Sequence, residues 1–260
     1  MNDELRRPGL SYKDADFLDS DDARPVRILS EYLAPLAALQ QQAVNETIVF
    51  FGSARLRPED PLGRYYEEAR ELARLVAEWS RSLPNGTQRF VVCTGGGGGI
   101  MEAANRGAAE AGERTLGLNI SLPTEQVPNP YVSPELCFEF HYFFMRKLWF
   151  SHLARALIAF PGGYGTLDEV FNTLTLAQTG KLDRKPLIVL YGQAYWREVL
   201  NLEALVRHGT IAPEDLALFR YADDPQEALA LLQGELNLEA GDTTPAFAKS
   251  RCAGEDCGEA

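Results

Sequence analysis

Between residues 47 and 206, short apolar runs alternate with stretches that carry apolar residues at helical spacing, and this alternation restricts the fold most. A continuous apolar run predicts a strand that is covered on both faces, as in the middle of a parallel sheet. The predicted strands are 47–52, 90–94, 115–120, 136–142, 156–160 and 186–191, with helices that include 100–111, 144–154 and 166–179. Strands that alternate with helices predict an α/β fold, here a Rossmann-like doubly wound parallel sheet with helices on both faces.

The two ends of the chain lack this pattern. Residues 1–22 are polar and acidic and predict a flexible arm, and residues 237–260, rich in glycine and acidic residues, predict a flexible tail. Residues 24–43 carry apolar residues at helical spacing, but Pro35 leaves two interpretations open, two short helices or one kinked helix. The sequence therefore predicts a single domain over 23–236 whose core is the alternating region.

The chain has a formal net charge of −12, which argues against a general nucleic-acid partner because a phosphate backbone needs a basic face. A locally positive pocket can still take a small anion. No signal peptide opens the sequence and no apolar run approaches the roughly 20 residues that span a bilayer, so we expect a cytoplasmic protein without a membrane partner. Cys93 and Cys137 lie in apolar runs and predict core residues, while Cys252 and Cys257 lack the partner pair of a zinc site.

Three of the predicted strands end in loops that contain glycine. These loops are 52–55, 95–99 and 162–166, and the last two lead directly into helices. Each loop alone is equally well explained as a tight turn, since a single glycine motif is weak evidence. The carboxyl ends of parallel strands lie at one edge of the sheet, however, and ligands bind at that edge. Because helix N-termini offer free amides and glycine lets them approach a phosphate, the three loops together predict a phosphate or nucleotide site.

Two well-known glycine patterns do not match these loops. In a dinucleotide site the glycine fingerprint follows the first strand, whereas here the richest glycine run follows the second. The third strand ends in Asn119-Ile120-Ser121, without an acid, and no glycine run ends in the Gly-Lys-Ser/Thr of a P-loop. The sequence therefore argues against both an ordinary dinucleotide site and a P-loop.

Charged residues accompany the loops. Glu169 lies three residues after Thr166 on the same predicted helix face, where its carboxylate would point towards a ligand of the 162–166 loop. Arg146 and Lys147 follow a predicted strand and lie between aromatic residues. A plainer explanation exists for each, since acids complement a helix dipole and cations at a helix start can be solvated. The place of Arg146 just after a strand favours bidentate binding of a phosphate or carboxylate.

Two of these segments resemble the paired motifs of the Lonely Guy (LOG) family, which was often mislabelled lysine decarboxylase. Phe144-Met145-Arg146-Lys147 resembles its MRK motif, and Pro161-Gly162-Gly163-Tyr164-Gly165-Thr166-Leu167-Asp168-Glu169 resembles its PGGxGTxxE motif. The likeness spans about residues 47–205, and the long N-terminal segment and C-terminal tail are similar to those of the longer bacterial members. The first loop departs from the family by reading Gly-Ser-Ala-Arg where Gly-Ser-Ser is commoner.

The resemblance implies an enzyme, a nucleoside 5′-monophosphate phosphoribohydrolase, that cleaves the N-glycosidic bond of a purine or cytokinin nucleotide to free base and ribose 5-phosphate. Arg146 and Glu169 are the implied catalytic residues, and the 162–166 loop would hold the 5′-phosphate. Glu125 is the nearest match to a further glutamate of the family site. The implied substrate-binding residues are Ser53, Gly96, Gly97, Glu125, Lys147, Gly162, Gly163, Tyr164, Gly165 and Thr166.

The resemblance also implies a homodimer or higher homo-oligomer, and it implies no metal and no organic cofactor. Two substrates stay open, AMP for an AMP nucleosidase and isopentenyladenosine monophosphate for cytokinin biosynthesis. Two roles stay open for Glu169, activation of water and stabilisation of the ribose. The alternative function is a non-catalytic nucleotide or molybdenum-cofactor carrier of the same fold, which would need the loops but not Arg146 with Glu169. Lysine decarboxylation would need a pyridoxal phosphate lysine, and no lysine has such a context.

Overall fold

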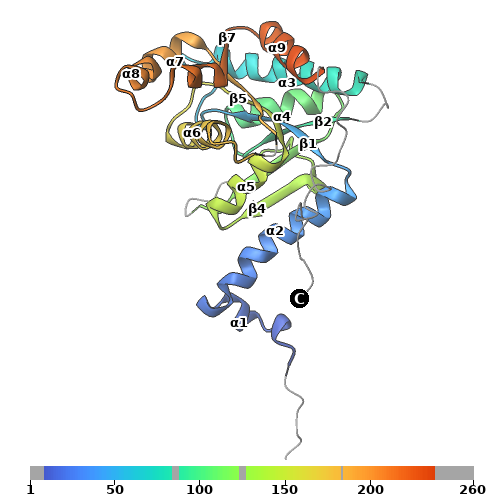
Figure 1. Ribbon diagram of the computed structural model, residues 1–260. Helices are drawn as coiled ribbons and strands as arrows, with labels where there is room; N and C mark the ends of the chain where they lie inside the picture. The colour runs from blue at the N-terminus through green and yellow to red at the C-terminus, as the bar shows by residue number, and fades with distance from the viewer. Residues whose placement is uncertain (1–8, 84–87, 123–126, 183, 238–260) are drawn as a thin grey trace, which may run out of the picture.

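The computed structural model contains one seven-stranded sheet with helices on both faces (Figure 1), and it describes residues 9–83, 88–122, 127–182 and 184–237. The strands are β1 (Glu46–Phe51), β2 (Phe90–Thr94), β3 (Thr115–Ile120), β4 (Cys137–Phe140), β5 (Ala154–Ala159), β6 (Leu187–Tyr191) and β7 (Phe219–Ala222). Their order is β4-β3-β2-β1-β5-β6-β7, and every pairing is parallel. The α/β, Rossmann-like doubly wound fold that the sequence predicts is confirmed.

The helices divide between the two faces of the sheet. They are α1 (Ala15–Asp19), α2 (Arg24–Gln41), α3 (Arg64–Ser82), α4 (Ile100–Glu110), α5 (Phe143–Leu153), α6 (Tyr164–Gln178), α7 (Gln193–Val199), α8 (Leu202–Arg207) and α9 (Pro225–Asn237). Side chains alternate between the faces of a strand, so Ile48 and Phe50 of β1 pack under α3, α4 and α9. Val49 and Phe51 point the other way and pack with α2, α5 and α6. The two hydrophobic cores hold the central strand from both sides.

The N-terminal region consists of short helical turns followed by one long helix. The chain forms a continuous helix through Pro35, so of the two interpretations open at this proline the structure has a single helix. Residues 11–23 form short turns around α1, and the Arg27 guanidinium donates to the carbonyls of Leu18 (2.5 Å) and Ser20 (2.6 Å). In Figure 1, α1 and the start of α2 extend away from the sheet. The flexibility of the arm and of the tail stays a prediction.

The strand order reverses at β1, and this reversal positions the candidate site. The chain adds β2, β3 and β4 on one side of β1 and then returns to place β5 on its other side. The loops that follow β1 and β5 therefore diverge from two adjacent strands, which is where open α/β sheets bind their ligands. Across the described ranges, none of the helices has both the length and the apolar character needed to cross a membrane.

Candidate active site

Three glycine-containing loops meet at the carboxyl edge of the sheet, around β1. The amide of Phe160, at the end of β5, donates to the carbonyl of Phe51 (2.8 Å), and the amide of Ser53 donates to the carbonyl of Pro161 (3.0 Å). The carbonyl of Ser53 accepts in turn from the amide of Ile100, the first residue of α4 (3.0 Å). The backbone of the first loop is thus tied to the loop after β5 and to the one after β2. The three loops form one surface.

The 95–99 loop is packed too closely for side chains. Gly96 has φ = +71° and Gly99 has φ = +63°, a region that L residues rarely adopt. A Cβ on Gly96 would collide with the Asn119 carboxamide, and one on Gly99 would collide with the backbone of Ser53 and Ala54. Glycine at these two positions therefore lets three chain segments come together beneath the site.

The loop after β5 leads straight into α6. The carbonyl of Gly162 accepts a hydrogen bond from the Tyr195 hydroxyl (2.8 Å), and Thr166 is buried against Gly162. The first amides of a helix have no partner within it, and the helix dipole makes this end positive. Helix α6 has 15 residues, so its start at Tyr164 provides a well-formed N-terminus for an anion.

Arg146 and Glu169 lie between the 95–99 loop and the 162–166 loop. Arg146 belongs to the first half of α5 and Glu169 to the second turn of α6. Their side chains approach within 3.5 Å (Nη2 to Oε1) and are only 14% and 5% exposed. A Cβ on Gly95 would be 3.9 Å from Arg146 Nη1, so the guanidinium also borders the 95–99 loop. The structure therefore brings together the two charged residues that the sequence singles out.

This ion pair is buried and incompletely hydrogen-bonded. Burial raises the pKa of the Glu169 carboxyl above its usual value, although the positive charge of Arg146 opposes this. Burial also lowers the pKa of Arg146. Glu169 Oε1 and Arg146 Nε have no hydrogen-bond partner among the described residues. Buried polar atoms without partners are costly, so the pair has unused capacity to bind a ligand.

The remaining predicted residues differ in their surroundings. Lys147 forms an ion pair with Asp168 (2.6 Å), on the solvent side of Glu169. The Tyr164 side chain is 93% exposed and projects away from the loop, so within one chain only its backbone lies at the site. The Ser53 hydroxyl accepts from the Arg55 amide (3.2 Å), while Gly97 and Gly165 lie within their respective loops. Glu125 lies outside the described residues.

A buried polar network under the 95–99 loop was not predicted. Asn129 donates hydrogen bonds to the carbonyls of Gly96 and Gly97 and to the carboxamide oxygen of Asn105. The Thr94 hydroxyl donates to the same oxygen of Asn105 (2.7 Å) and accepts from the Gly96 amide (2.9 Å). Only one cue was available in the sequence, because Thr94 directly precedes the glycine run. The other two residues come from a helix and a loop that only the fold brings close.

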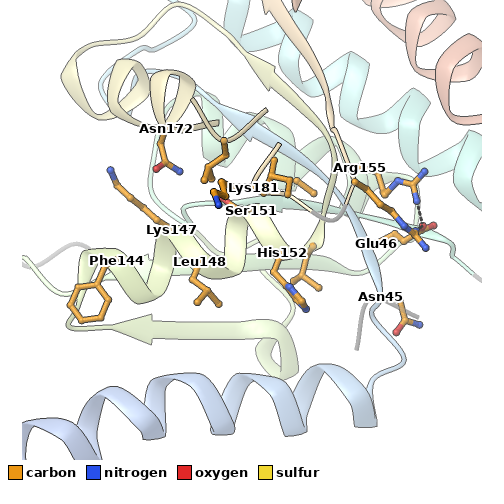
Figure 2. Close-up of a pocket in the computed structure, with 15 residues that line it drawn as sticks. Asn45, Glu46, Phe144, Lys147, Leu148, Ser151, His152, Arg155, Asn172 and Lys181 are labelled. Atoms are coloured by element: carbon orange, nitrogen blue, oxygen red, sulfur yellow. Dashed lines mark hydrogen bonds and ion pairs between the residues drawn. The ribbon is translucent and has the colours of Figure 1, made fainter. Parts of the chain in front are cut away.

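A well-defined cavity lies elsewhere, between α5, α6 and the amino ends of β1 and β5 (Figure 2). It has a volume of about 460 Å³, and neither Arg146 nor Glu169 lines it. At its inner end Glu46 is bound by Arg155 (2.6 Å), Arg184 (3.1 Å) and Arg89 (2.8 Å). These ion pairs join the start of β1 to neighbouring segments, so we assign this cluster a structural role. No three His, Cys, Asp or Glu side chains gather as a metal site would need, as far as the described residues go.

The chain is similar to several known proteins. A family model described as "Possible lysine decarboxylase" matches residues 101–232. The chain is 26% identical over 205 residues to the "Probable cytokinin riboside 5′-monophosphate phosphoribohydrolase LOGL3" of Oryza sativa subsp. japonica, which covers 75% of this chain and 86% of the relative. It is 29% identical over 146 residues to the "Cytokinin riboside 5′-monophosphate phosphoribohydrolase LOG7" of Arabidopsis thaliana, with coverage of 55% and 65%.

Among solved structures, the chain is similar to the Moco carrier protein from Chlamydomonas reinhardtii, with a TM-score of 0.51 and 23% identity. The similarity covers 75% of this chain and 99% of the carrier. At this identity the likeness supports the fold and says nothing about the ligand.

Proposed function

Because the chain belongs to the Lonely Guy (LOG) family, we propose that it hydrolyses the N-glycosidic bond of a purine or cytokinin nucleoside 5′-monophosphate. The products are the free base and ribose 5-phosphate. One observation carries the proposal: the buried Arg146–Glu169 pair lies between two glycine loops suited to phosphate. The relatives named above support the substrate class, since their names specify cytokinin riboside 5′-monophosphates.

In this reaction, charges of opposite sign must be stabilised at the two ends of the breaking bond. As the C1′–N bond lengthens, positive charge builds up on the ribose and negative charge on the base. Water attacks C1′, its oxygen forms the new bond, and the base leaves with a proton. A carboxylate close to the ribose stabilises the cation or takes the proton from water, and we assign this role to Glu169. The guanidinium of Arg146 favours the ionised form of Glu169, against the effect of burial, and would offset negative charge nearby.

The phosphate anchors the substrate far from the breaking bond. The free amides at the start of α6, in residues 164–166, would bind the 5′-phosphate together with Gly162 and Gly163. The 95–99 loop and Ser53 would border the same phosphate from the opposite side. Lys147 would add positive charge at the rim. Such fixed contacts raise the rate by orienting the glycosidic bond towards the carboxylate.

A carrier of nucleotides or of molybdenum cofactor is the second candidate, because the fold is similar to that of a Moco carrier protein. A carrier has no need for a buried carboxylate held by an arginine at the site. The Arg146–Glu169 pair therefore favours the hydrolase.

Incubation with nucleotides tests the proposal. AMP, isopentenyladenosine monophosphate, GMP, CMP and adenosine are supplied separately, and free base and ribose 5-phosphate are quantified by chromatography. We expect release of a purine base from a monophosphate and much slower cleavage of adenosine, since adenosine lacks the anchoring phosphate. Tight binding of AMP without any base release would favour the carrier. Equal cleavage of AMP and adenosine would contradict phosphate anchoring.

A further inference from the structure

Asn129 binds the 95–99 loop from its buried side. The residue is 7% exposed. Its backbone amide donates to the Gly96 carbonyl (2.8 Å), and its side-chain Nδ2 donates to the carbonyls of Gly96 (3.1 Å) and Gly97 (2.9 Å). Two consecutive loop carbonyls are thereby turned towards one asparagine.

The orientation of the Asn129 carboxamide is fixed by its neighbours. Nδ2 faces three acceptors, namely the two loop carbonyls and Asn105 Oδ1 (2.9 Å). On the opposite side, Oδ1 accepts from the Tyr131 amide (3.1 Å). The reversed orientation would place an oxygen against three oxygens and an NH₂ group against an N–H. The side chain therefore acts as a donor to the loop.

The direction of the carbonyls determines the direction of the next amides. In a trans peptide the C=O of one residue and the N–H of the next point in opposite directions. Since the carbonyls of Gly96 and Gly97 point towards Asn129, the N–H groups of Gly97 and Gly98 point away from it. In the part of the chain that the structure describes, neither amide has a protein acceptor. Two adjacent free donors of this kind form a cradle for an anion.

We propose that Asn129 is a positioning residue that holds the amides of Gly97 and Gly98 towards the phosphate-bearing part of the nucleotide. The inference rests on the proposed function only for the identity of the anion. The hydrogen bond from the Gly96 amide to Thr94 Oγ1 adds to the same arrangement, because it keeps this third amide on the buried side. Asn129 itself does not touch the substrate, so its effect passes through the loop backbone.

Substitution by aspartate tests the donor role with almost no change in side-chain size. In Asn129→Asp a carboxylate oxygen replaces Nδ2 and faces the same three acceptors, so the loop carbonyls are released. We expect the dissociation constant of AMP to rise at least about tenfold, the loss of one hydrogen bond to a charged group. The affinity for adenosine should change much less. Both constants are measured by titration calorimetry, and circular dichroism verifies folding.

Two further variants make the outcome decisive. Asn129→Ala removes the donor without adding charge, and it should show the same selective loss of AMP affinity. This variant also replaces Asn129→Asp in the test if Asn129→Asp does not fold. Asn45→Asp adds the same charge at the opposite edge of the sheet and should bind AMP as the wild type does. Equal loss of AMP and adenosine affinity, or an unchanged preference for AMP, would overturn the positioning role. All proteins carry Glu169→Gln in these titrations so that AMP binds without turnover, and selective loss of AMP affinity upholds the positioning role even if the wild type hydrolyses nothing.

Discussion

At the scale of single residues, burial and the charge of Arg146 have opposite effects on the pKa of Glu169. Its side chain is 5% exposed, and desolvation favours the neutral carboxylic acid. Arg146, at 3.5 Å, favours the carboxylate. A buried carboxylate that is stabilised by the positive charges of Arg146 and Lys147 and that retains an oxygen without a hydrogen bond is suited to meet a developing cation in a substrate. This balance makes Glu169 the most informative residue to change.

Substitution of Glu169 by glutamine should remove turnover and leave nucleotide binding detectable. The amide has nearly the same shape but cannot carry the negative charge, so we expect kcat for base release to fall by about 10²–10⁴-fold, the usual contribution of a positioned acid or base. Asp168→Asn is the matched control, since Asp168 is the adjacent acid but is exposed. Near-normal base release by Glu169→Gln would remove this residue from the mechanism.

The pH dependence of turnover should reflect the same conflict. The carboxylate is the active form, and the pKa of Glu169 is raised above the ordinary value of 4.5. Activity should therefore be complete well above the raised pKa and be lost as pH falls through it, so the acid limb of kcat/KM lies at higher pH than for an exposed glutamate. Profiles of kcat/KM with AMP between pH 4 and 8 measure this. An acid limb at or below pH 4.5 would contradict it.

For single residues, the sequence predicted which charged residues belong to the site, but it did not predict the residues that support the site or the exposure of their side chains. Arg146 and Glu169 belong to continuous motifs, and the family resemblance already named them together as catalytic residues. Asn129 could not be expected, because its role depends on a loop distant in sequence reaching under Gly96 and Gly97. The exposure of the Tyr164 side chain could not be predicted either, since the sequence of a glycine loop does not show in which direction its one large side chain points.

At the scale of elements, the site depends on how closely strand-ending loops approach one another. Gly99, the residue before α4, has φ = +63° and lies directly against the backbone of the first loop. Helix α5 is anchored in a different way: Glu31 of α2 accepts from the amides of His141 (2.8 Å) and Tyr142 (3.2 Å), just before α5 starts. The N-terminal helix therefore helps to hold the helix that carries Arg146.

Replacement of Gly99 by alanine should damage both stability and nucleotide binding. The unfavourable φ costs about 1–3 kcal/mol, and the new Cβ would push the Ser53–Ala54 backbone away from α4. Gly112→Ala is the control, because Gly112 has φ = +79° but open space around its Cβ position. We expect both variants to unfold at lower temperature and only Gly99→Ala to lose AMP affinity. Equal AMP affinities in the two variants would show that the contact between the loops is dispensable.

The sequence predicted six of the seven strands and missed β7. Five of the six have apolar runs that are covered on both faces, which is the pattern of central parallel strands. Even β4, at one edge of the sheet, contains two phenylalanines. Strand β7 has four residues, lies at the other edge and includes exposed Arg220, so it has neither the length nor the apolar run to be recognised.

At the scale of the whole molecule, the outer face of α5 and α6 exposes a group of large apolar side chains. Large hydrophobic side chains of α5 and α6 are exposed beside the site, and they include Phe143, Phe144, Leu148 and Phe171. Phe144 and Leu148 also line the cavity of about 460 Å³ shown in Figure 2. Exposed apolar surface of this kind commonly marks a contact between proteins. We propose that this face joins two copies of the chain about a twofold axis, as is most common in homo-oligomers.

A charge placed on this face should therefore dissociate the assembly. We expect light scattering after gel filtration to give the wild type the mass of a dimer or larger, and to give Leu148→Glu that of a monomer. Leu29→Glu is the control, since Leu29 is an exposed apolar residue of α2 and does not belong to α5 or α6. If α2 forms a second contact between subunits, a larger assembly such as a hexamer should fall to the mass of a dimer in Leu29→Glu. If Leu29→Glu keeps the mass of a wild-type dimer, the interface is restricted to α5 and α6. A monomeric wild type, or a Leu148→Glu variant that stays assembled, would contradict the proposed face.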